Sequence, residues 1–149
     1  MSCAASWMGD AMSSTSIRWW FARATLAYAA LINTFLGFLF LLEPTRVTKY
    51  GFVFEDIAAG YGYVRTTTAS MFLGIAVTAI YGLVRPTRFL ACLWFVVVMN
   101  AAIVFTRIYG IAIDGYSPIT IIELRDEGLS WLVFVAALFF APRAPRSAS

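Results

Sequence analysis

Charged side chains beside long apolar segments are the residues of this chain best suited to chemistry. Glu123 and Glu127 are four residues apart, a spacing that places two carboxylates on one face of a helix. Unpaired, they would repel each other, and ionisable groups at membrane depth are costly. Arg107 directly follows the preceding apolar segment, and a guanidinium group can form a bidentate pair with a carboxylate. The pattern therefore predicts a cluster of Arg and carboxylate side chains.

Further members of this cluster are predicted from the ends of the apolar segments. Arg65 opens the second segment, and Asp114 follows the third. Glu43 ends the first. These ends meet at one level in an antiparallel bundle, so the charges should converge there. The candidate ligand-binding or ion-pair residues are Arg65, Arg107, Asp114, Glu123 and Glu127.

Three interpretations of this cluster stay open. The first is a structural clamp, in which ion pairs only hold the helix ends together, and the residues favour it. The second is a polar pocket that binds a small ligand or a lipid headgroup. A proton relay is the weakest, because the inner halves of the apolar segments lack titratable groups to continue a path.

Metal, haem and dithiol chemistry find little support. The chain has no histidine, which removes the commonest zinc, haem and general-base group. Cys3 and Cys92 form no CxxC motif and lie in different settings. We therefore expect no catalytic residues, no metal, no cofactor and no disulfide.

Four apolar segments must position the cluster. They cover residues 24–42, 66–84, 89–106 and 129–141, the last with a helix pattern extending back to Pro118. With 61% hydrophobic and 13% charged residues, the chain is far from soluble composition, and about 20 apolar residues cross a bilayer. We predict an all-α integral membrane protein, an antiparallel four-helix bundle.

Small residues predict where the helices approach one another. Asn33 and Gly37 belong to a seam on the first helix, and Ser70 and Gly74 to a second face. In lipid such seams allow close packing, and Asn33 is expected to form an interhelical hydrogen bond.

The connections carry their own signals. Residues 45–62 alternate apolar and charged side chains, which favours a short interfacial helix, and the Gly60-Tyr61-Gly62-Tyr63 run predicts a turn. The short link at Pro86 predicts a hairpin of the second and third helices. Ser117 suits an N-cap and Pro118 the first helical position.

The predicted organisation is a polar N-terminal tail (1–17), a four-helix transmembrane domain (18–141) and a basic C-terminal tail (142–149). No cleavable signal peptide is expected, and the first span acts as the targeting signal. An even number of spans puts both termini on one side, and Lys and Arg mark the cytoplasmic side. That side would hold Arg18, Arg23, Arg85, Arg88, Arg143 and Arg146. Both termini are therefore predicted to be cytoplasmic.

The order Arg65, Ala69-Ser70, Gly74, Arg107, Asp114-Gly115 and Glu123 resembles the family catalogued as domain of unknown function 4345. The resemblance spans residues 24–140, and it implies a small four-helix protein of the bacterial cytoplasmic (inner) membrane. Ala69 and Ser70 stand where the family pattern has two glycines. The family carries no established activity, so the resemblance adds nothing about chemistry.

Three functions remain open. The first is a non-enzymatic accessory or lipid-associated protein, with membrane lipids, other membrane subunits or a second copy as partners. The second is a small oligomeric transporter or ligand-binding protein that uses the charged cluster. The third is an intramembrane enzyme with a carboxylate acid or base, which no nucleophile–base pair supports. The dispersed basic residues do not indicate nucleic-acid binding.

Overall fold

The residues that the computed structural model describes, 4–50, 54–115 and 117–141, form helices joined by short turns, with no strand among them. The helices are α1 (Ala4–Leu42), α2 (Ile57–Tyr63), α3 (Ser70–Val84), α4 (Phe89–Asp114) and α5 (Pro118–Phe140). Short 3₁₀ helices cover Pro44–Tyr50 (η1) and Pro86–Arg88 (η3), and a π-helical turn covers Val64–Ala69 (η2). The all-α prediction is confirmed for these residues.

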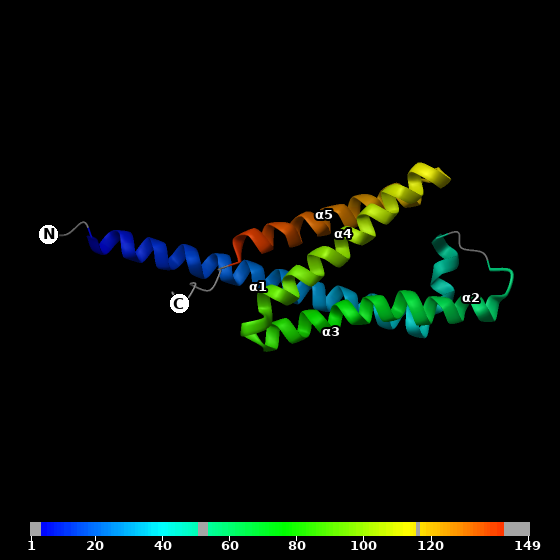
Figure 1. Cartoon of the computed structure of the whole chain (residues 1–149), viewed down its shortest axis with the longest axis horizontal. Helices are drawn as coiled ribbons and strands as arrows, with labels where there is room; N and C mark the ends of the chain where they lie inside the picture. The colour runs from blue at the N-terminus through cyan, green and yellow to red at the C-terminus, as the bar shows by residue number, and fades with distance from the viewer. Residues whose placement is uncertain (1–3, 51–53, 116, 142–149) are drawn as a thin grey trace, which may run out of the picture.

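The first helix is longer than predicted. It begins at Ala4 and continues through the expected boundary at residue 17 to Leu42. Alanine is the best helix former, and the segment before Arg18 contains no proline to stop a helix. Residues 4–17 are therefore the start of α1, and α1 projects beyond the other helices there (Figure 1).

α2, η2 and α3 follow one another without a break and form one continuous helical rod from Ile57 to Val84. Since it follows α1 in the chain, we call it the second rod. Asp56 caps its start by accepting a hydrogen bond from the backbone N–H of Ala59 at 3.0 Å. The predicted turn at Gly60–Tyr63 is wrong, because these residues are helical. Gly60 instead lies against the Phe54 ring, where a Cβ would come within 2.2 Å.

The segment predicted to form a short interfacial helix, 45–62, is helical in part. Residues 44–50 form η1, which follows the end of α1 and stands upright from the α1–α3 pair (Figure 1). From Ile57 onward the chain already belongs to the second rod. Residues 51–53 lie outside the described residues.

The predicted hairpin of the second and third helices and the predicted helix start at Ser117-Pro118 are both confirmed. η3 joins α3 to α4 within a few residues, and α4 passes into α5 through a short turn. Ser117 forms a capping box with Thr120, and Pro118 occupies the first turn of α5. Gly115 ends α4 with φ 88°, a conformation that favours glycine.

The helices form two antiparallel pairs, α1 with α3 and α4 with α5. The pairs pack together at one end and diverge toward the α4–α5 turn (Figure 1). We call the first the packed end, where Trp19 lies 4.8 Å from Phe89 between ring centroids and Arg18 lies over Phe140. We call the other the cluster end, where η1, the start of α2 and the α4–α5 turn lie.

The seam on α1 forms the predicted close approach. Ala22, Ala29, Asn33 and Gly37 are all buried, and a Cβ at Gly37 would meet the Leu73 side chain at 2.7 Å. The prediction that Asn33 forms an interhelical hydrogen bond is wrong, because its amide donates to the Ala29 carbonyl of its own helix at 2.8 Å.

α3 does not pack through the small-residue face predicted for it, but through a different set of small residues. Ser70 and Gly74 are exposed, and no atom lies within 4 Å of a Cβ built at Gly74. The buried small residues of this helix are Ala76, Ala79 and Gly82. Alanine gives the same close approach without a hydroxyl that needs a partner, whereas the Ser70 hydroxyl donates to the carbonyl of Thr66 within its own rod.

Three helices are long and apolar enough to cross a membrane: Ser16–Leu42, Ile57–Val84 and Pro86–Asp114. Many of their large apolar side chains point away from the bundle, as in Leu31, Leu42 and Val84. α5 falls outside this set because its first half carries Glu123, Arg125, Asp126 and Glu127.

Candidate functional site

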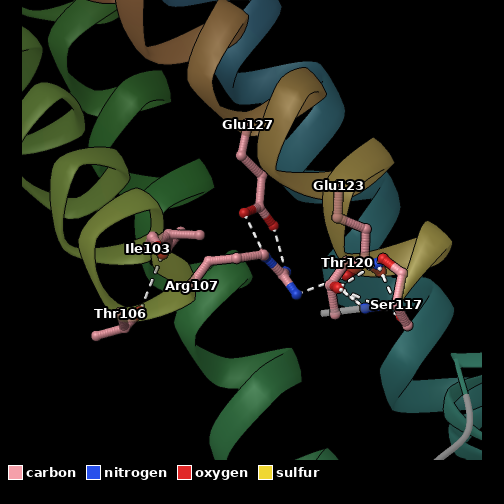
Figure 2. A network of polar contacts seen from close by, with 7 residues as sticks. All are labelled: Ile103, Thr106, Arg107, Ser117, Thr120, Glu123 and Glu127. Atoms are coloured by element: carbon pink, nitrogen blue, oxygen red, sulfur yellow. Dashed lines mark hydrogen bonds and ion pairs between the residues drawn. The ribbon is translucent and has the colours of Figure 1, made fainter. Parts of the chain in front are cut away.

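Arg107 joins α4 to α5 through both glutamates (Figure 2). Its Nε and Nη2 donate to Oε2 and Oε1 of Glu127 at 2.7 and 2.5 Å. Its Nη1 donates to Oε2 of Glu123 at 2.5 Å. The first pair is the bidentate fork that gives guanidinium–carboxylate contacts their strength. These three residues, the cluster from here on, are the predicted site residues that the structure brings together as ion pairs.

Local structure explains why the three side chains meet. Glu123 and Glu127 occupy successive turns of one face of α5, whose start is fixed by the Ser117–Thr120 capping box (Figure 2). Arg107 lies seven residues before the end of α4, about 10 Å at about 1.5 Å per residue. Because the hairpin turn is short, this depth matches that of the two glutamates.

The cluster carries more negative than positive charge. Two carboxylates face one guanidinium, so the ionised cluster has a net charge of −1. Glu127 uses both oxygens on Arg107, whereas Oε1 of Glu123 accepts a hydrogen bond from no described residue. The side chains of Arg107, Glu123 and Glu127 are 28%, 24% and 28% exposed, which leaves that oxygen room for a further partner.

Arg65 does not join the cluster. It lies in the π-helical turn η2, where its Nε donates to the Leu41 carbonyl at 3.2 Å. Leu41 is in the last turn of α1, where carbonyls lack helical partners. The prediction for Arg65 is therefore corrected: its guanidinium caps the C-terminus of α1.

The remaining predicted acids are also separate from the cluster. Glu43 pairs with Arg46 at 2.6 Å on the surface beside η1. Asp114 is exposed at the end of α4 and forms no ion pair with a described side chain. Asp126 pairs with its neighbour Arg125 at 2.8 Å.

A cavity of about 370 Å³ opens between the two helix pairs beside the cluster. Arg107, Glu123 and Glu127 form its polar wall. The other lining residues are mostly aliphatic or aromatic and come from α1, η1, the segment just before α2, the second rod and α4: Leu36, Phe40, Val47, Phe54, Tyr63, Val64, Thr68, Met71, Phe72 and Ile103. Its volume lies within the range of ligand pockets, about 300–1,000 Å³.

A second, more open hollow of about 430 Å³ also borders Arg107. It shares Met71, Ile103 and Arg107 with the first and adds Asp114 and Thr120 to its lining. Arg107 therefore lines both the cavity and a neighbouring surface hollow.

Sequence reasoning identified the polar wall of the cavity and missed its apolar walls. Phe40 and Phe72 stack at 6.0 Å between centroids, and Val47 of η1 is buried beside them. The alternation of apolar and charged residues in 45–57 was the available signal that this segment covers apolar surface.

The described residues hold no group of three or more His, Cys, Asp or Glu side chains that could bind a metal ion. No family model, curated protein or solved structure matches this chain.

Proposed function

We propose that this chain is a membrane protein that binds an amphiphilic molecule and carries out no reaction on it. The apolar part of the ligand occupies the cavity between the helix pairs, and its polar group contacts the Arg107–Glu123–Glu127 cluster. One observation carries the proposal: an apolar cavity of ligand size ends on a partly exposed cluster of charged side chains.

The cavity favours binding over a purely structural clamp. A clamp between α4 and α5 needs only Arg107 and its two glutamates. Here α1, η1 and the second rod also surround the space in front of these side chains. A half-open apolar cavity of this size, with a few charged groups at one wall, has the form of a ligand pocket and is therefore a functional candidate.

The proposed location is a bacterial cytoplasmic membrane with both termini cytoplasmic, as the resemblance to the family of domain of unknown function 4345 and the distribution of arginines suggest. It requires α5 to cross the membrane as a fourth span. Ring contacts support this, because Phe140 at the end of α5 lies 6.1 Å from Phe21 of α1. Phosphatase and fluorescent-protein fusions at residues 1 and 149 test it, and opposite orientations of the two ends would refute it.

The binding proposal is tested with a photoreactive probe, an uncharged dodecyl alcohol that carries a diazirine in its chain. We expect labelled peptides from the cavity walls, especially around Met71 and Phe72. Thr68→Trp places a large ring in the cavity and should reduce this labelling about fivefold, a loss of about 1 kcal/mol.

The matched control is Thr67→Trp, because Thr67 is the exposed neighbour of Thr68 and does not line the cavity. It should leave the labelling unchanged. Equal labelling of the lipid-facing surface and the cavity, with no effect of Thr68→Trp, would show that the cavity holds no amphiphile.

A second candidate, an accessory subunit or a self-associating protein, rests on the exposed face at Ser70 and Gly74. Small residues let a partner helix approach closely in lipid. Gly74→Cys should then form an intermolecular disulfide in membranes more readily than Val77→Cys, which is also exposed on α3. Equal crosslinking at both positions would remove this candidate.

A further inference from the structure

The charge balance of the cluster bears on the kind of polar group that the cavity accepts. The two glutamates and one arginine sum to −1, and Glu123 Oε1 is the carboxylate oxygen that accepts a hydrogen bond from no described residue. We infer that the cavity selects amphiphiles whose polar group is an ammonium, either an alkylammonium or the ammonium of a lipid headgroup. This inference rests on the proposed binding function and names its ligand class.

An anionic group meets two obstacles at this site. Arg107 already uses three of its five N–H donors on Glu123 and Glu127, so an anion would find few donors left. An anion on the remaining donors would also lie beside two carboxylates of the same charge at an apolar wall, where repulsion is weakly screened. An ammonium meets no such repulsion, because it can donate to Glu123 Oε1 and bring the cluster to neutrality.

Other described charges at the cluster end reinforce this preference. Arg46 and Arg125 are paired with Glu43 and Asp126, and Arg65 donates to a backbone carbonyl. Glu55, Asp56 and Asp114 are exposed at the same end. Among the described side chains, acids therefore outnumber bases around the entrance, which attracts cations and repels anions.

The apolar walls suit the same ligand class. Phe40, Phe54, Tyr63 and Phe72 contribute rings to the cavity. Aromatic faces attract ammonium groups, whose charge is spread over several methyl groups when they are quaternary. A single-chain alkylammonium thus matches both the charged wall and the apolar walls.

The experiment compares three diazirine probes with the same dodecyl chain and different ends: a primary ammonium, a hydroxyl and a carboxylate. On the wild-type chain in uncharged detergent, we expect half-maximal labelling of the cavity at about a tenfold lower concentration for the ammonium than for the carboxylate. Glu123→Gln keeps the Glu127 fork and removes the excess charge, so it should abolish this preference. Asp126→Asn, an equal charge change on the exposed side of α5, should leave it intact.

The outcomes separate the inference from the proposed function. Absence of cavity labelling by all three probes refutes both. Labelling with equal strength, or with the carboxylate preferred, overturns the inference and leaves amphiphile binding standing. The probe comparison on the wild-type chain decides this even if Glu123→Gln does not fold.

Lipid nanodiscs distinguish the two sources of an ammonium. Protection of the cavity from the ammonium probe by phosphatidylethanolamine, and not by phosphatidylglycerol, supports a lipid headgroup as the ligand. Labelling that neither lipid prevents supports a free alkylammonium. Stronger protection by phosphatidylglycerol contradicts an ammonium site.

Discussion

The packed end and the cluster end of this bundle hold their helices together by different interactions. At the packed end, one continuous core joins all four long helices through small residues such as Ala22, Ala29 and Ala79 and through Phe134. At the cluster end, a smaller core under η1 contains Phe40, and the helix pairs diverge around a cavity and an ion-pair cluster.

The difference teaches which forces hold each end. In lipid, apolar surface alone gives little drive for helices to associate, so close packing must supply dispersion contacts. The packed end does this where Gly82 meets Cys92 and Leu26. The cluster end forgoes tight packing, and Arg107 holds α4 to α5 by charge and hydrogen bonds. The packed end therefore holds the four long helices together, which allows the cluster end to stay open around the cavity.

The largest expected contrast is between two phenylalanines. Phe134 is 1% exposed in the packed core, and Phe134→Ala leaves a cavity there. Such changes cost about 3–5 kcal/mol in soluble proteins, and about 2–3 is expected in lipid because the transfer part shrinks. Phe72 already borders a cavity, so Phe72→Ala should cost roughly half as much. Unfolding in mixed micelles measures both, and equal costs would contradict the contrast.

The next effect concerns the cluster. Arg107→Gln leaves two carboxylates close together without a cation. The triple variant, which adds Glu123→Gln and Glu127→Gln, leaves no charged side chain in the cluster. Breaking a fully buried pair costs about 3–5 kcal/mol, and partial exposure reduces this to about 1–3. The triple variant should recover part of the loss in the same unfolding measurement. A triple variant less stable than Arg107→Gln would show that the carboxylates need no counter-ion.

Glycines on the same helix give a matched comparison of packing. A Cβ at Gly82 would lie 2.6 Å from Cys92 Cβ, so Gly82→Ala forces α3 and α4 apart. Such overpacking costs about 1–3 kcal/mol. Gly74→Ala meets nothing within 4 Å and should stabilise α3 by up to about 1 kcal/mol. Thermal unfolding in detergent measures both shifts, and shifts of the same sign would contradict the packing assigned to the two faces.

Local patterns made the helices and the core of the cluster predictable. Apolar runs bounded by Pro, Gly and charge defined the long helices, and Ser117-Pro118 fixed the start of α5. The spacing of Glu123 and Glu127, together with a short hairpin, was enough to predict their contact with Arg107. These features depend on neighbours in sequence or on a single turn.

Features that depend on distant contacts could not be predicted. Gly60 reads as a turn residue until the Phe54 ring is seen against it. Arg65 lies in a π-helical turn, which adds one residue to the turn and so shifts the register by about 100° from a regular helix. The cavity exists because two helix pairs diverge, which no single segment encodes.

The smallest expected effect tests that correction for Arg65. Among the described residues its guanidinium donates a hydrogen bond to the Leu41 carbonyl alone, and a cation at a helix C-terminus contributes about 0.3–1 kcal/mol. Arg65→Gln should therefore destabilise the chain by less than about 1 kcal/mol. It should also leave the preference for the ammonium probe unchanged, because Arg65 does not line the cavity.

Arg85→Gln is the matched control, since Arg85 is exposed at the end of α3 and no described hydrogen bond is lost from its side chain. The difference between the two variants then measures the Leu41 contact alone. A loss in Arg65→Gln as large as that in Arg107→Gln, or a changed probe preference, would place Arg65 among the charges of the cluster. The packed and cluster ends would then differ in one more arginine, and the net charge assigned to the cavity would have to be revised to zero.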